Sequence, residues 1–175
     1  MRLIATAFLV LSSCASVSAQ RPEDRHIDFS LIERLPIGKI PSAEVVKLIG
    51  APTEILALKR EFKTQEAWLY FENIGNIRTQ RLSLLIDKKT GTVLTALWSL
   101  KEGDPFYSKD LALAHFKDAQ FVARSTGAVG KDYYSDDQFY NDPQKGISIY
   151  VREGSLHAES ISFAMPLPDA VATRN

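Results

Sequence analysis

The sequence of 175 residues lacks the features of several protein classes. It has one cysteine, Cys14, so no disulfide is expected within the folded domain. Its 21 basic residues are balanced by 21 acidic ones, which argues against nucleic-acid binding, because that function usually shows as a basic excess. No apolar run reaches the roughly 20 residues that a membrane-spanning helix needs. The chain is 45% hydrophobic and 24% charged, as in an ordinary globular domain.

The N-terminal residues have the pattern of a bacterial export signal. Arg2 provides the positive start and residues 3–11 a short apolar core. Two cleavage sites compete. Small residues ending at Ala19 suit signal peptidase, whereas residues 11–14 resemble a lipobox in which Cys14 is lipidated. The signal is therefore residues 1–19, or 1–13 for a lipoprotein, and the protein is expected to be exported, either periplasmic or anchored to the outer membrane.

The remaining chain divides into a tether, one domain and a tail. Residues 20–36 are predicted to be a tether and lead-in, residues 37–165 a single domain, and residues 166–175 a loose tail. Within the domain, Ser42 is predicted to cap a short helix that Gly50 and Pro52 end. Strand patterns follow at residues 55–58, 67–71, 82–87 and 93–100, the last two joined by a hairpin with Gly91.

The same order of elements then recurs. Ser108 is predicted to cap a second helix, followed by strands at residues 121–124, 133–140, 147–151 and 156–163. Ser108 lies 66 residues after Ser42, and Ile147 lies 65 after Leu82. The shared offset indicates two repeats, of about residues 37–104 and 105–165. The fold class expected is α+β: two tandem units, each a helix plus an antiparallel meander, forming one sheet with short helices on one face.

A family resemblance fits this pattern. Residues 38–53, with Gly38, a short helix and the Gly50-Ala51-Pro52 stop, and then Trp68-Leu69-Tyr70, resemble the SmpA/OmlA family of small outer-membrane assembly lipoproteins. The tandem arrangement is similar to the beta-lactamase inhibitor protein fold. That resemblance implies one continuous sheet with a concave protein-binding face. The inhibitors use disulfides and the assembly lipoproteins have a single unit, which leaves the partner open.

The lipoprotein resemblance also bears on location. It favours lipidation of Cys14, and Ala15 is not the acidic residue that retains lipoproteins at the inner membrane. It therefore implies an outer-membrane destination.

Catalytic and metal sites are not predicted. The three histidines are isolated, without the spacing of metal ligands. No nucleophile elbow is present, and the acids of residues 132–142 match no calcium loop. We expect a non-enzyme without a cofactor or metal.

The aromatic residues indicate a contact surface instead. Alternation along residues 67–71 separates Trp68 and Tyr70 from three apolar neighbours, and the two rings are predicted to face the open side of the sheet. Trp98 is predicted to be buried. Side chains of Tyr, Trp and Arg dominate binding hot spots. The candidate partner-binding residues are Trp68, Tyr70, Tyr133, Tyr134, Phe139, Tyr140, Tyr150 and Arg152.

These observations predict a protein-binding adaptor of the cell envelope whose partner is another envelope protein. Membrane contact is expected only through a lipid at Cys14. Two alternatives remain open: a secreted inhibitor of an extracytoplasmic enzyme, and a small-ligand binder or hydrolase.

Overall fold

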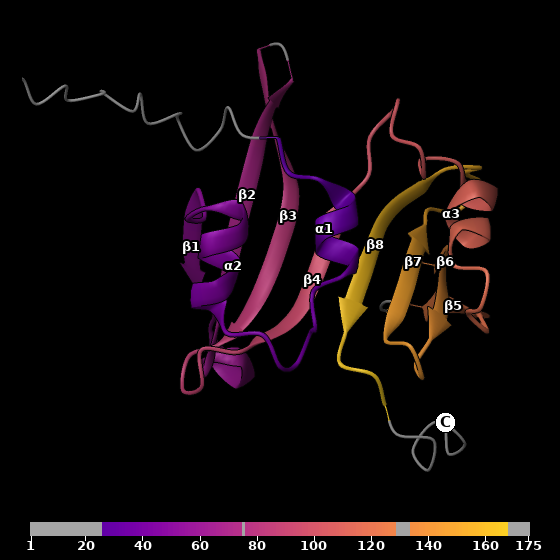
Figure 1. Cartoon of the computed structure of the whole chain (residues 1–175). Coiled ribbons are helices and arrows are strands. Elements are labelled where there is room, and N and C mark those ends of the chain that lie inside the picture. The colour runs from indigo at the N-terminus through magenta and orange to yellow at the C-terminus, as the bar shows by residue number, and fades with distance from the viewer. Residues whose placement is uncertain (1–25, 75, 129–133, 168–175) are drawn as a thin grey trace, which may run out of the picture.

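One antiparallel sheet organises the described residues, which are 26–74, 76–128 and 134–167 of the computed structural model (Figure 1). The sheet has eight strands in the order β1-β2-β3-β4-β8-β7-β6-β5. The strands are β1 (Glu54–Ala57), β2 (Gln65–Ile74), β3 (Ile77–Asp87), β4 (Val93–Ser99), β5 (Val122–Ala128), β6 (Tyr134–Asp142), β7 (Ile147–Val151) and β8 (Ala158–Ala164). The α+β class and the antiparallel strand pairing are therefore as predicted.

Short helices cover one face of this sheet. They are α1 (Phe29–Glu33), α2 (Ser42–Ile49) and α3 (Lys109–His115); the 3-10 turn η2 (Arg60–Phe62) lies between β1 and β2. Figure 1 shows α1 and α2 in front of the strands of the first half. The buried residue of each helix joins the same core as the strands: Ile32, Val45 and Ala112.

The helix starts differ from the prediction in one detail. Ser42 is the first residue of α2 and Pro41 occupies the cap position, without any side-chain cap bond. The start of α2 is held by the sheet, because the Ser42 N–H donates to the carbonyl of Gly91 at 2.7 Å. A strand-like bridge between Pro41 and Thr92 thus fixes the entry to the helix. Ser108 does take the cap position of α3, also without a side-chain bond.

The predicted lead-in contributes to the core. Asp28 caps α1 by accepting a hydrogen bond from the Ser30 N–H at 2.8 Å. The Phe29 ring lies 5.7 Å from that of Trp98 on β4 and 6.0 Å from that of Phe163 on β8. Helix α1 therefore packs over the seam where β4 meets β8. Trp98 is buried, as predicted.

A buried ion network lies beside this seam. A bulge in β3 leaves Arg81 without a partner in β2, because Leu82 pairs with Tyr70 and Gln80 with Phe71. Bulges redirect side chains, and Arg81 turns into the interior, where its guanidinium lies over the Trp98 ring at 4.5 Å.

Two carboxylates balance the buried charge of Arg81. Its two terminal nitrogens donate to Asp104 at 2.9 and 3.2 Å, and its Nε lies 3.2 Å from Glu72 Oε2 without a well-aligned hydrogen bond. Glu72 also accepts from the Ile27 N–H at 3.0 Å, which ties the N-terminal segment to β2. Glu72 and Arg81 are 5% and 2% exposed.

Removing the Arg81 charge is expected to destabilise the fold. Arg81→Ala would remove the guanidinium from both the Asp104 and Glu72 carboxylates and leave Glu72 with Lys101 at 3.7 Å. The expected cost is about 3–5 kcal/mol in the free energy of unfolding. Arg152→Ala is the matched control, because the Arg152 side chain is 66% exposed in its pair with Glu159 and should cost at most about 1 kcal/mol. Urea denaturation of both variants measures the difference. Equal costs would show that the Arg81 network is not a stabilising element.

Candidate functional site

The face of the sheet opposite the helices, called the open face here, carries no helix among the described residues. Strand register places side chains across it in rows, because paired residues of antiparallel strands point to the same side. One row runs over four strands through Val122, Asn141, Ser148 and Ser162. The next runs through Arg124, Phe139, Tyr150 and Ser160. The open face of the second half is therefore rich in hydroxyl, amide and aromatic groups.

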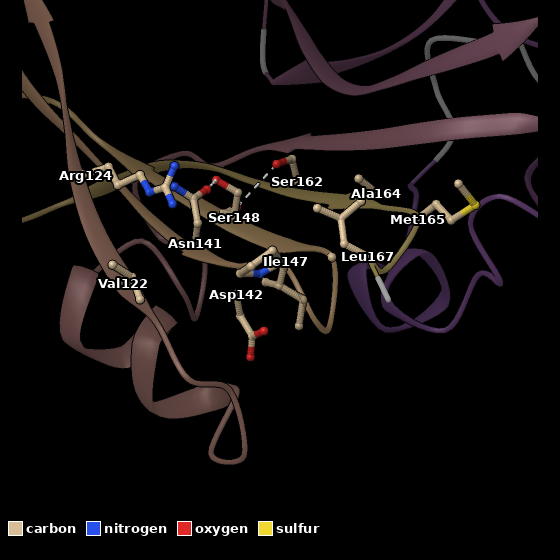
Figure 2. Close-up of a pocket in the computed structure, with 12 residues that line it drawn as sticks. Val122, Arg124, Asn141, Asp142, Ile147, Ser148, Ser162, Ala164, Met165 and Leu167 are labelled. Atoms are coloured by element: carbon tan, nitrogen blue, oxygen red, sulfur yellow. Dashed lines mark hydrogen bonds between the residues drawn. The ribbon is translucent and has the colours of Figure 1, made fainter. Parts of the chain in front are cut away.

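A hollow of about 610 Å³ lies at one end of this face. Arg124 lies on β5, Asn141 on β6, Ser148 on β7 and Ser162 on β8, and Figure 2 shows them on one side of the hollow. The chain after β8 closes the other side with Met165 and Leu167. The Leu167 N–H donates to the carbonyl of Pro143 at 2.8 Å, which holds this segment beside the β6–β7 turn.

The polar groups of the hollow are linked to one another. The Ser148 hydroxyl donates to Asn141 Oδ1 at 2.5 Å, and the Ser162 hydroxyl donates to the Ser148 carbonyl at 3.5 Å. The Asn141 amide donates to the Phe139 carbonyl at a long 3.5 Å. Hydrogen bonds of this length are weak, so the amide and the Ser162 hydroxyl remain available to a ligand.

A second cluster lies beside the hollow, on β6 and β7. The Phe139 and Tyr150 rings pack with centroids 5.0 Å apart. The Tyr150 hydroxyl donates to Asp137 Oδ2 at 2.7 Å, and this bond to a carboxylate raises the pKa of Tyr150 above its ordinary value, with burial as the next cause. Asp137 Oδ1 accepts from the Glu153 N–H at 2.8 Å. The bond to the carboxylate fixes the hydroxyl of the Tyr150 ring.

Arg152 continues this cluster at its exposed end. Its Nη2 lies 2.9 Å from the Glu159 carboxylate, which raises the pKa of Arg152, with the Tyr150 hydroxyl as the second cause. The structure therefore brings together Phe139, Tyr150 and Arg152 of the predicted contact residues. The register places Tyr150 opposite Ser160, on the other side of the sheet from buried Ile149 and its partner Ile161.

The predicted placement of Trp68 and Tyr70 is wrong. Trp68 pairs with Leu84 and Tyr70 with Leu82, so both rings point to the helix-covered face. Tyr70 is 3% exposed, and its hydroxyl donates to the carbonyl of Gly50 at the end of α2, at 3.3 Å. Trp68 is half-buried against the core. The predicted alternation of side chains along β2 is correct, but the residues on both faces of this strand are apolar. The two larger rings, Trp68 and Tyr70, lie on the face that the helices cover.

The other predicted residues have separate outcomes. Tyr140 pairs with Ile149 and packs against the core, so it also lies on the helix face. Tyr134 begins β6, but its side chain lies outside the described structure. Tyr133 and Cys14 lie outside the described residues altogether.

A smaller hollow of about 340 Å³ lies on the helix side, between α1 and the segment before α3. Phe29, Phe106 and Trp98 line it, and the His115 Nε2 lies 2.9 Å from Glu33 Oε1 at its edge. No hydroxyl or thiol of the described residues hydrogen-bonds to His115. Nor do residues 26–74, 76–128 and 134–167 hold any group of three or more potential metal ligands.

Several residues of the site were missed from the sequence. Arg124, Asn141 and Ser162 lie on three different strands and up to 38 residues apart in the sequence. Only the strand register brings them together. The one available signal was the alternation of Ser148 with buried neighbours on β7. Asp142, considered as a calcium ligand, instead accepts from the Gln120 and Lys145 N–H groups at 2.7 and 3.1 Å.

The Tyr150–Asp137 pair gives a measurable titration. A raised pKa means that this bond stabilises the fold fully below the ordinary Tyr pKa of 10.0 and is lost as pH rises through the folded value. In Asp137→Asn the carboxylate charge is gone, so the pKa of Tyr150 should fall toward its ordinary value. NMR titration of the tyrosine ring carbons measures the pKa of Tyr150. Glu159→Gln is the control, in which this pKa should fall less, because the Glu159 charge is a smaller cause of the shift than Asp137. An unchanged Tyr150 pKa in Asp137→Asn would contradict the pairing.

Comparison with known proteins gives no relative. No protein-family model, curated protein or solved structure matches this chain. The function has to be inferred from the sequence and from the geometry of the open face.

Proposed function

We propose that this chain is a non-catalytic protein of the bacterial cell envelope that binds another envelope protein through its open face. The observation that carries the proposal is the uncovered face itself, since the helices pack on the opposite side of the sheet. On it, Phe139 and Tyr150 offer aromatic surface and Arg124 offers charge. Arg152 adds a second charge beside the Tyr150 hydroxyl. Residues of these types form the centres of protein interfaces.

A tandem origin of the two halves supports the resemblance to envelope adaptors and inhibitors. In the first half, the N–H of Ser42 donates to Gly91 O and that of Val93 to Ile40 O. In the second half, the N–H of Lys109 donates to Leu156 O and that of Ala158 to Tyr107 O. The matching residues lie 65 or 67 positions apart. We infer that the halves are two copies of one unit, related about the seam between β4 and β8.

The hollow favours small-ligand binding as a second candidate function. Its volume of about 610 Å³ falls within the roughly 300–1,000 Å³ of typical ligand sites.

Cross-linking in whole cells tests the protein-binding proposal. Phe139→p-benzoylphenylalanine replaces one ring on the open face with a photoreactive ring and should give a reproducible adduct with one envelope protein. Ala43→p-benzoylphenylalanine places the same group on the exposed side of α2 and should not give that adduct. Absence of any protein adduct from position 139, or the same adducts from both positions, would contradict binding through the open face.

The mature N-terminus distinguishes the anchored adaptor from the secreted inhibitor. No helix of the described residues is long and apolar enough to cross a membrane. We propose that Cys14 is lipidated and attaches the protein to the outer membrane. Mass spectrometry should then find an acylated chain that begins at Cys14. An unmodified chain that begins at Gln20 would instead support a soluble periplasmic or secreted protein.

A further inference from the structure

The hollow beside β5 contains a positive charge, the guanidinium of Arg124. Within the described residues, the Arg124 guanidinium forms no ion pair and no hydrogen bond. Among the described residues of the lining, Asp142 is the one acidic residue. It is 3% exposed, and both of its oxygens accept backbone N–H groups. Figure 2 shows its carboxylate pointing away from Arg124, whose side chain extends toward Asn141. The charge that the hollow exposes to a ligand is therefore the guanidinium of Arg124.

We propose that this hollow binds a carboxylate attached to an apolar group. The proposal deepens the proposed function, on which it rests, by naming the chemical group that the open face recognises. An arginine donates two parallel hydrogen bonds to a carboxylate, which a single amide or hydroxyl cannot do. A carboxylate only accepts hydrogen bonds, and the groups nearest to Arg124 include the donors that such a ligand needs.

Those donors come from the row next to Arg124. The Asn141 amide and the Ser162 hydroxyl have long internal bonds of 3.5 Å, so each can turn to a ligand oxygen at little cost. The Ser148 hydroxyl is already used, because it donates to Asn141 Oδ1 at 2.5 Å. That bond holds the Asn141 oxygen toward Ser148 and leaves its NH₂ group for the hollow.

The remaining wall of the hollow is apolar. It is formed by Val122, Ile147, Ala164, Met165 and Leu167, and Val122 is 57% exposed. An apolar group on the ligand would cover these side chains and remove their surface from water, which is favourable in proportion to the area buried. A preference for ligands that carry both a carboxylate and an apolar group distinguishes this site from a surface arginine that attracts any anion.

Such a carboxylate has two possible sources, an acidic side chain beside a leucine or similar residue of a bound protein, or a small organic acid. We infer the first, because the hollow opens on the same face as Phe139 and Tyr150, within reach of one protein surface.

The test compares charged and neutral probes on the full mature protein. The probes are the acetylated tripeptide amide Leu-Glu-Leu, its neutral analogue Leu-Gln-Leu, and hexanoate. Amide NMR titration should show saturable shifts at residues lining the hollow with Leu-Glu-Leu, and binding weaker by about ten-fold or more with Leu-Gln-Leu, as expected for loss of a charge-assisted bond. Tighter binding of the tripeptide than of hexanoate assigns the carboxylate to a protein, and the reverse order assigns it to a small acid.

Two variants separate charge from shape. Arg124→Gln removes the guanidinium, and Asn141→Asp adds a neutralising charge while it keeps the Ser148 bond; both should abolish the preference for Leu-Glu-Leu. Lys47→Gln, on the exposed side of α2 and outside the hollow, should keep it. Equal affinity for the two tripeptides, undiminished binding in Arg124→Gln, or no binding of either acid at millimolar concentration overturns the proposal. A partner cross-linked at position 139 would in that case still support protein binding through the open face.

Discussion

The pairing of β4 with β8 is the interaction on which the molecule depends. Five residue pairs, from Thr95 with Ala164 to Ser99 with Ser160, join two groups of four strands that would otherwise have separate edges. The same register aligns Trp98 with Ile161 on the covered face and Leu97 with Ser162 on the open face. The core and the open face are both continuous for this one reason. Helix α1 then covers the seam, with Phe29 against rings from both strands.

The ion network at the seam explains why the N-terminal segment belongs to the domain. Buried charges are costly unless they are paired, and Arg81 has Asp104 and Glu72 as partners. Glu72 in turn holds the backbone of Ile27, and Asp104 belongs to the connection between the two halves. A single guanidinium thus links β3 to the segment before α1 and to the linker before α3. The network acts on three parts of the chain that are distant in sequence.

The sequence was sufficient to predict the helices and strands, but not to predict which face of the sheet each strand residue lies on. Alternation and turn residues predicted each strand to within a few residues, because those signals are local. On β7, Ile149 is buried and Tyr150 is half-exposed, and the pattern is readable from the sequence because Ile147, Ile149 and Val151 alternate with polar or aromatic residues. On β2 both parities are apolar, so the side on which Trp68 lies depends on its partner Leu84, a long-range contact. Arg81 could not be foreseen as a buried residue, because a bulge in the register, and not its polarity, directs it inward.

The sheet separates the residues that pack in the core from those that line the open face. Neighbours along β7 illustrate it: Ile149 is fully buried, whereas Ser148 and Tyr150 on either side reach the opposite surface. A change at an open-face position therefore leaves the packing beneath the helices intact. If the open face binds a partner as proposed, substitutions there can change the specificity of the protein without a loss of stability.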